Sequence, residues 1–127
     1  MGRVRTYRDL IVWQRAMELV TAVYSASQGL PRSELYGLTG QMRRAAVSVP
    51  SNIAEGYARN SDGDFARFLR MACGSLYELQ TQVEIAQRLG YLTANVVEGM
   101  TGLSAEVEKM LSRLIGKVSD HHGAQDA

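Results

Sequence analysis

The apolar residues between positions 62 and 89 follow one spacing more strictly than those in any other part of the chain. They alternate steps of four and three residues without a miss: Phe65, Leu69, Ala72, Leu76, Leu79, Val83 and Ala86. This alternation is the heptad pattern of helices that pack nearly parallel to one another. Ser61 and Asp64 precede it as a helix-start signal of the capping-box type, and Gly90 follows it as a stop signal. The pattern predicts a long helix over residues 62–89, which needs partner helices to bury its stripe.

Three further segments show helical periodicity. In residues 9–28, with Asp9 as the N-cap, the expected buried face is Leu10, Trp13, Met17, Val20 and Tyr24. In residues 34–58, which begin near Ser33, it is Leu35, Leu38, Met42, Ala45 and Val49. In residues 94–118, with Thr93 as the cap, it is Val96, Met100, Leu103, Val107, Met110 and Leu114. The turns between the segments are short, which is typical of antiparallel neighbours.

We therefore expect an all-α protein, an up-down-up-down antiparallel four-helix bundle whose second helix is kinked at Pro50. The 127 residues suit one domain, which we place at residues 1–119. Periodicity stops after it, so residues 120–127 are expected to form a flexible tail. A chain of this size can bury enough surface to fold without a disulfide or a metal ion.

The single cysteine, Cys73, excludes an internal disulfide and favours a reducing compartment. The sequence shows neither the apolar core of a signal peptide nor a run approaching the roughly 20 apolar residues of a membrane span. We expect a cytoplasmic protein with no membrane partner.

Enzymatic activity is not expected. The two histidines, His121 and His122, lie in the predicted tail, so no histidine is left within the bundle to act as the base of a nucleophilic triad. The Glu-x-x-His pairs of di-iron bundles are also absent. Glu55, Glu78 and Glu84 could supply oxygen ligands to a nuclease metal, but they lack a recognisable ligand spacing. The sequence predicts no catalytic residue, metal ion, cofactor or small-molecule substrate.

Positive charge is concentrated in the first part of the chain. Residues 1–70 carry ten arginines against six acidic residues, whereas residues 71–127 carry four basic and seven acidic ones. Arginine is well suited to bind phosphate through two hydrogen bonds. The candidate phosphate contacts for RNA or DNA are Arg8, Arg15, Arg43, Arg44, Arg67 and Arg70. The alternative is scattered surface charge that nearby acidic residues neutralise.

The segment from Arg43 to Arg59 departs from simple amphipathic helix. A polar stripe of Arg44, Ser48, Asn52, Glu55 and Arg59 runs beside its apolar stripe, and Pro50 interrupts both. Either the stripe faces solvent, with Glu55 and Arg59 paired, or it contacts another subunit. Gly74 and Ser75, inside the predicted helix over 62–89, suggest a close approach of another helix or subunit. The candidate interface residues are Ser48, Pro50, Asn52, Glu55, Gly56, Arg59, Gly74 and Ser75.

The run from Gln41 to Gly56, QMRRAAVSVPSNIAEG, resembles the signature of four-helix-bundle proteins known from intervening sequences of bacterial 23S ribosomal RNA genes. Residues 9–14 and 68–79 are similar to the same family, and the resemblance spans residues 7 to 118. It implies a small all-α bundle related to the accessory proteins of diversity-generating retroelements, which are associated with nucleic acid and a reverse transcriptase. It also implies a homopentameric ring, because relatives of known structure form one.

The expected function is therefore that of a non-enzymatic homo-oligomer, a pentamer, with a nucleic-acid-associated or scaffold role. The alternative is a protein-interaction module that does not bind nucleic acid, such as an accessory to a reverse transcriptase.

Overall fold

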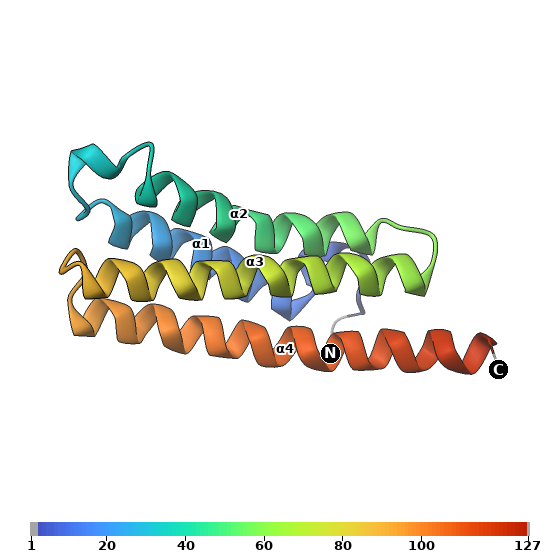
Figure 1. The fold of residues 1–127 in the computed structure, drawn as a ribbon. Helices are drawn as coiled ribbons and strands as arrows, with labels where there is room; N and C mark the ends of the chain where they lie inside the picture. The colour runs from blue at the N-terminus through green and yellow to red at the C-terminus, as the bar shows by residue number, and fades with distance from the viewer. Residues whose placement is uncertain (1–2, 127) are drawn as a thin grey trace.

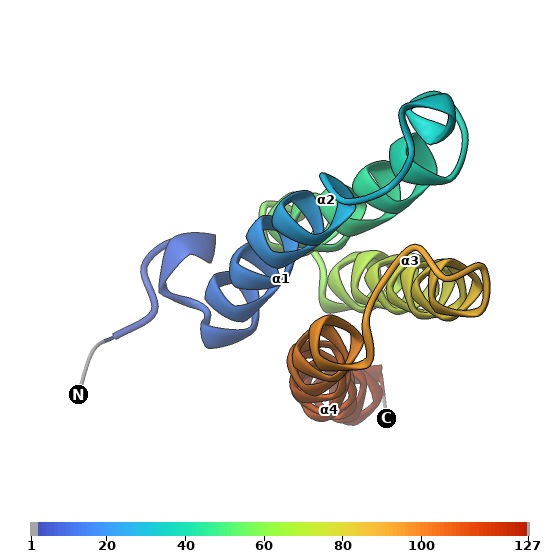
Figure 2. The same ribbon diagram turned by 90° about the vertical axis from the view of Figure 1, so that its left-hand side faces the viewer.

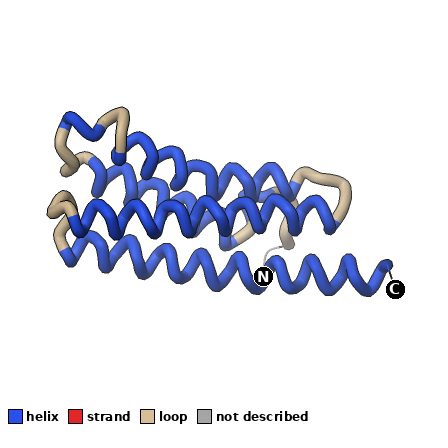
Figure 3. Tube along the Cα trace, in the orientation of Figure 1, coloured by secondary structure: helices blue, strands red, loops and turns tan. Residues whose placement is uncertain are grey.

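Long helices make up most of the protein. The structure, a computed structural model, describes residues 3–126, with side chains described through residue 119. Within these residues there are four α-helices, two short 3₁₀ helices and no strand (Figure 1; Figure 3). The elements in chain order are η1 (Tyr7–Asp9), α1 (Ile11–Ser27), η2 (Arg32–Glu34), α2 (Leu38–Tyr57), α3 (Asp62–Arg88) and α4 (Ala94–Asp126). The predicted all-α class is confirmed.

The four α-helices surround a shared core. Each contacts two others, so that α1 packs against α2 and α4, and α3 packs against the same two helices. Successive helices run in opposite directions in Figure 1, and Figure 2 shows them grouped around one centre. None of the described helices combines the length and the apolar character that crossing a bilayer requires.

Every α-helix contributes fully buried side chains to the core. The predicted stripe of α3 is confirmed at Leu69, Ala72, Leu76 and Leu79, and that of α2 at Met42, Ala45 and Val49. The largest side chains with almost no exposure are Leu19, Met42, Ile53, Leu69, Leu76, Leu79 and Leu111. Removing these aliphatic groups from water provides the main driving force for folding.

The predicted buried face of α1 is only partly correct: Leu10, Trp13 and Val20 are partly buried against the core. Val12, Ala16, Leu19 and Val23 are the buried residues, whereas the side chains of Met17 and Tyr24 remain 41% and 42% exposed. Both sets repeat with helical spacing, and the prediction chose the larger side chains. The two sets lie side by side on the helix, so helical spacing alone does not show which of them is more deeply buried.

The beginnings of α1 and α2 also differ from prediction. Asp9 does not cap α1; its carboxylate accepts hydrogen bonds from the backbone N–H groups of Arg5 and Thr6, and with Thr6 it forms the capping box of η1. The second helix starts at Leu38, whose N–H donates to Glu34 Oε1 at 3.2 Å. Gly37, which has a φ of −107° and a ψ of −115°, is not helical and separates the 3₁₀ helix η2 from α2.

The ends of α3 were predicted correctly. Ser61 Oγ accepts a hydrogen bond from the Asp64 N–H at 3.1 Å, and Gly90 adopts a φ of 78°. The N–H of Tyr91 then donates to the carbonyl of Ala86, which completes a Schellman motif. The Tyr91 hydroxyl donates to Glu34 Oε2 at 3.0 Å, so the α3–α4 turn is tied to the segment between α1 and α2.

The helix α4 starts as predicted after Thr93 and continues to Asp126, past the expected end at residue 118. Once a helix is nucleated, each further residue adds a backbone hydrogen bond at little cost, and no proline interrupts this one. The flexibility expected of residues 120–127 stays a prediction, as does the domain boundary at residue 119, and Ala127 lies outside the described residues. The chain is helical on both sides of Pro50, whose expected kink also stays a prediction.

Candidate functional site on the seam between α2 and α3

A small hydrogen-bond network joins α2 to α3 at the polar stripe. Ser48 Oγ lies 2.8 Å from Ser75 Oγ, and Asn52 Nδ2 donates to the Ser48 carbonyl and hydroxyl at 2.8 and 2.9 Å. The Ser48 hydroxyl accepts from Asn52, and either serine hydroxyl can donate to the other. These three half-buried side chains therefore hold two helices of one chain together. We call the strip around them, formed by Arg44, Val47, Ser48, Asn52, Met71, Gly74 and Ser75, the α2–α3 seam.

One turn further along α2, Gly56 lies directly against α3. A Cβ at this position would lie 2.6 Å from Phe68 Cβ and 3.1 Å from Phe65 Cδ1, both of which are too close for carbon atoms. The sequence identified Gly56 as an interface candidate and as the end of the helix. It lies inside α2, where the absence of a side chain lets the two helices come together.

At the same end of the seam, two arginines share one aromatic ring. The guanidinium carbons of Arg59 and Arg67 each lie 4.7 Å from the ring centroid of Phe68. Arg59 pairs with Glu55 at 3.1 Å, as in the solvent-facing alternative for the polar stripe, and Arg67 pairs with Asp64 at 3.4 Å. Sequence analysis missed this grouping, because Phe68 falls outside the heptad stripe and the two arginines lie on different helices.

Gly74 behaves differently from Gly56. It is exposed, and a Cβ built on it would meet no described atom within 4 Å. A close helix within the chain is therefore not the reason for this glycine. Contact with another subunit, the other expectation, stays a prediction.

The six candidate arginines do not form one patch in a single chain. Arg43 and Arg44 lie near the start of α2, whereas Arg67 and Arg70 lie near the start of α3. Since α2 and α3 run in opposite directions, the two pairs lie toward opposite ends of the bundle (Figure 1).

Most of these arginines already contact groups of their own chain. Arg43 donates to Ser27 Oγ at 2.9 Å and lies over the ring of Tyr24, which ties α2 to α1. Arg15 forms ion pairs with Glu18 and Glu106, and Arg67 forms one with Asp64. Arg70 donates a hydrogen bond to Ser119, and Arg8 lies over the rings of Tyr7 and Trp13. Within residues 3–119, Arg44 is the candidate whose side chain makes no ion pair, hydrogen bond or cation–π contact.

Residues 8–113 match the sequence model of one family, described as 23S rRNA-intervening sequence protein. The chain belongs to this family. The predicted membership is confirmed, and the matched range contains the whole α2–α3 seam. No curated protein matches the chain.

The fold of this family member is similar to that of a solved protein. The crystal structure is of a protein of unknown function from the S23 ribosomal protein family of Bacteroides thetaiotaomicron VPI-5482. It superposes with a TM-score of 0.76 at 24% sequence identity, over 82% of this chain and 97% of the other. At this identity the likeness shows the fold. Neither the family description nor the name of the neighbour mentions a catalytic activity.

The chemistry of Cys73 in this 23S rRNA-intervening sequence protein is that of a half-buried thiol. Burial raises its pKa, the carboxylate of Glu108 raises it further, and Arg70 opposes both effects. The thiol is therefore protonated at neutral pH, which disfavours nucleophilic chemistry. Among the described side chains, no group of three or more His, Cys, Asp or Glu is placed to hold a metal ion. The side chains of His121 and His122 lie outside the described residues.

Proposed function

We propose that the protein acts by binding, without catalysis, as a homo-oligomeric four-helix bundle with a nucleic-acid-associated or scaffold role, and that the oligomer is a pentamer. The α2–α3 seam is the proposed contact between subunits. This proposal extends the family membership, since the description of the family names a genetic context and no molecular activity.

The observation that supports self-association is an uncovered strip along the seam. Val47 and Met71, whose side chains are 40% and 47% exposed, flank the half-buried serines, and the open glycine Gly74 lies beside them. A glycine in a helix interior costs roughly 0.5–1 kcal/mol relative to alanine. No contact within the chain compensates for this cost at Gly74 or at Gly102 of α4, so the exposed Val47 and Met71 beside Gly74 are what favour the seam as the contact. A neighbouring subunit whose backbone lies close to Gly74 would compensate for it and would cover the two apolar side chains.

The first test measures the mass of the protein in solution by sedimentation or light scattering. We expect five times the 14.0 kDa mass of the chain at micromolar concentration. Replacing Gly74 with leucine should release smaller species, because the new side chain occupies the proposed contact while the monomer has room for it. Gly102, an equally open glycine of α4, provides the matched control: Gly102→Leu should leave the mass unchanged.

A monomer across this concentration range would exclude a constitutive ring. Equal effects of the two leucine substitutions would show that the seam is not the contact.

Nucleic-acid association rests on the arginines that a ring would repeat. Arg44 is an exposed residue of the α2–α3 seam, so fivefold repetition would concentrate a modest charge into one basic surface. For binding of this kind, the logarithm of the association constant falls linearly with the logarithm of the salt concentration.

The second test follows binding of a labelled RNA or DNA oligonucleotide over a series of salt concentrations. We expect a steep salt dependence, and Arg44→Gln should reduce the slope by about 1 for each phosphate that an Arg44 side chain of the ring contacts. Arg113→Gln, which removes the same charge from α4, is the control and should leave the slope unchanged. Binding that ignores salt, or no binding at low salt, would count against this part of the proposal.

One observation favours the alternative of a protein-interaction module without nucleic-acid binding. Five of the six candidate arginines are already engaged within the chain. If the oligomer forms but no oligonucleotide binds, the ring surface is better explained as a docking site for a protein such as a reverse transcriptase. Co-purification of the oligomer with such an enzyme, lost in Gly74→Leu, would test that function.

A further inference from the structure

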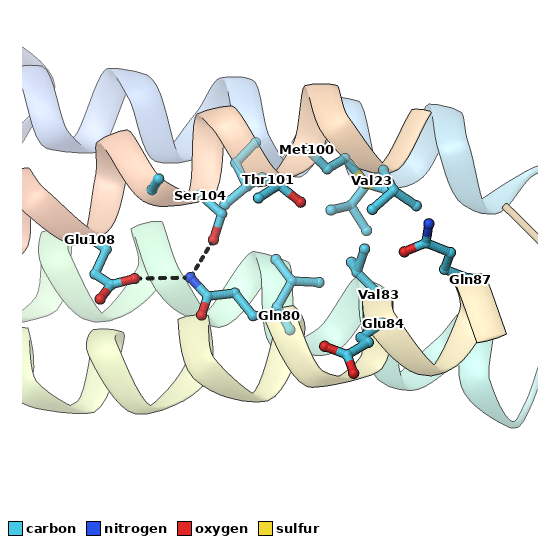
Figure 4. A pocket seen from close by; sticks show the side chains of 13 residues that line it. Val23, Gln80, Val83, Glu84, Gln87, Met100, Thr101, Ser104 and Glu108 are labelled. Carbon is cyan, nitrogen blue, oxygen red and sulfur yellow. Dashed lines mark hydrogen bonds between the residues drawn. The ribbon is translucent and has the colours of Figure 1, made fainter. Parts of the chain in front are cut away.

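A pocket of about 360 Å³ opens between α3 and α4, with α1 forming its floor (Figure 4). Leu19, Val23 and Leu79 make its inner surface apolar, and Gln80, Glu84 and Glu108 contribute polar groups toward its rim. Its volume lies within the range of about 300–1,000 Å³ that is typical of small-molecule sites. The pocket is separate from the α2–α3 seam, because none of the seam residues lines it.

The carboxylate of Glu108 is held in place by neutral groups. Gln80 Nε2 donates to Glu108 Oε1 at 3.1 Å and to Ser104 Oγ at 2.7 Å, and the Tyr77 hydroxyl donates to Glu108 Oε2 at 3.3 Å. The two bonds of Gln80 are drawn in Figure 4, and none of the three bonds brings a positive charge to the Glu108 carboxylate.

The charge of Glu108 has no cationic partner among the described side chains. In contrast, Glu84, the other acidic residue of the pocket, pairs with Arg88 at 2.8 Å. The Glu108 carboxylate is also the main cause of the raised pKa of Tyr77. Among the described side chains, no lysine, arginine or histidine lines the pocket. The site is therefore electrostatically complementary to a cation and repels an anion.

We propose that this pocket binds a small organic cation, a protonated amine attached to an apolar body. The ammonium group would lie against the Glu108 carboxylate, which its neutral donors hold in position. The apolar body would lie on the floor of Leu19, Val23 and Leu79. This is a binding site and not a catalytic one, and it goes beyond the function proposed for the seam.

The test uses three probes that differ only in the terminal group: 4-phenylbutylamine, 4-phenylbutan-1-ol and 4-phenylbutanoate. Each is titrated into the full-length protein while the backbone amide signals are followed by NMR. The amine should give saturable shifts at pocket residues and bind about tenfold more tightly than the alcohol, because hydrogen bonds to charged groups are the stronger ones. The carboxylate probe should bind more weakly than the alcohol.

Substitutions separate the charge from the shape of the pocket. Glu108→Gln keeps an oxygen acceptor but removes the charge, so the advantage of the amine should vanish while the alcohol binds as before. Glu98→Gln, on the exposed surface of the same helix, should change neither affinity. Ala105→Leu, which narrows the pocket, should weaken the binding of the amine and the alcohol together.

Three results would overturn the proposal: equal affinity for the amine and the alcohol, tighter binding of the carboxylate probe, or no saturable shift at pocket residues with the amine. If Glu108→Gln does not fold, the comparison of the three probes on the unaltered protein still decides the question.

Discussion

Gly56 and Phe68 meet at a place where the protein has no room for one more carbon atom. Because Gly56 has no side chain, α2 can lie against the first turns of α3. The guanidinium groups of Arg59 and Arg67 lie over the Phe68 ring at this contact. At the scale of single residues, the distance to neighbouring atoms decides whether a glycine position can accept a side chain, and the residue type alone does not show this distance. The sequence alone could not separate Gly56 from Gly74, since both are glycines within helical segments, yet one is tightly enclosed and the other is open.

We predict that Gly56→Ala lowers the free energy of unfolding by about 1–3 kcal/mol, the usual cost of overfilling a packed site, although alanine favours helix. Urea denaturation monitored by circular dichroism would measure the change. Gly102→Ala is the control: its Cβ meets open space, so it should raise stability by roughly 0.5–1 kcal/mol. A stabilising Gly56→Ala would mean that the helices can separate at no cost.

At the scale of elements, local signals located some helix ends and missed others. The start of α3 was predictable because Ser61 and Asp64 form a self-contained signal within four residues. The start of α2 was not, because Glu34 acts from a preceding 3₁₀ helix and bonds to the N–H of Leu38. Periodicity could not predict the buried face of α1 either, since two neighbouring stripes of that helix have the same spacing. Which stripe is buried depends on how the neighbouring helices pack against α1.

We expect Ser61→Ala to cost about 1 kcal/mol of stability, the typical value for loss of an N-cap side chain. Ser33→Ala removes a hydroxyl from the position that the sequence indicated as the start of the second helix, where the structure has an exposed residue of η2. It should change stability by a few tenths of a kcal/mol at most. Thermal or urea unfolding of the two variants side by side would measure both values. Similar losses would indicate that Ser33 also caps a helix.

At the scale of the whole molecule, the sequence predicted the class of fold and not the contacts between helices. Heptad spacing and short turns are local properties, so the four helices followed from them. The link from Arg43 to Ser27, the bond between Ser48 and Ser75 and the pocket beside Glu108 all join segments distant in sequence. They depend on how far each helix is shifted along its neighbours, which no local pattern encodes. For the same reason, arginines counted together in the sequence lie toward opposite ends of the bundle.

The hydrogen bond between Tyr91 and Glu34 joins two chain reversals that are far apart in sequence. Insertions are normally tolerated in surface connections, because lengthening a loop costs little entropy. Here the α3–α4 turn is hydrogen-bonded to the segment between α1 and α2, and Glu34 also accepts a hydrogen bond from the first backbone N–H of α2. Length variation among natural homologues should therefore avoid this end of the molecule and accumulate at the short turn between α2 and α3, where no comparable cross-link is found among the described residues.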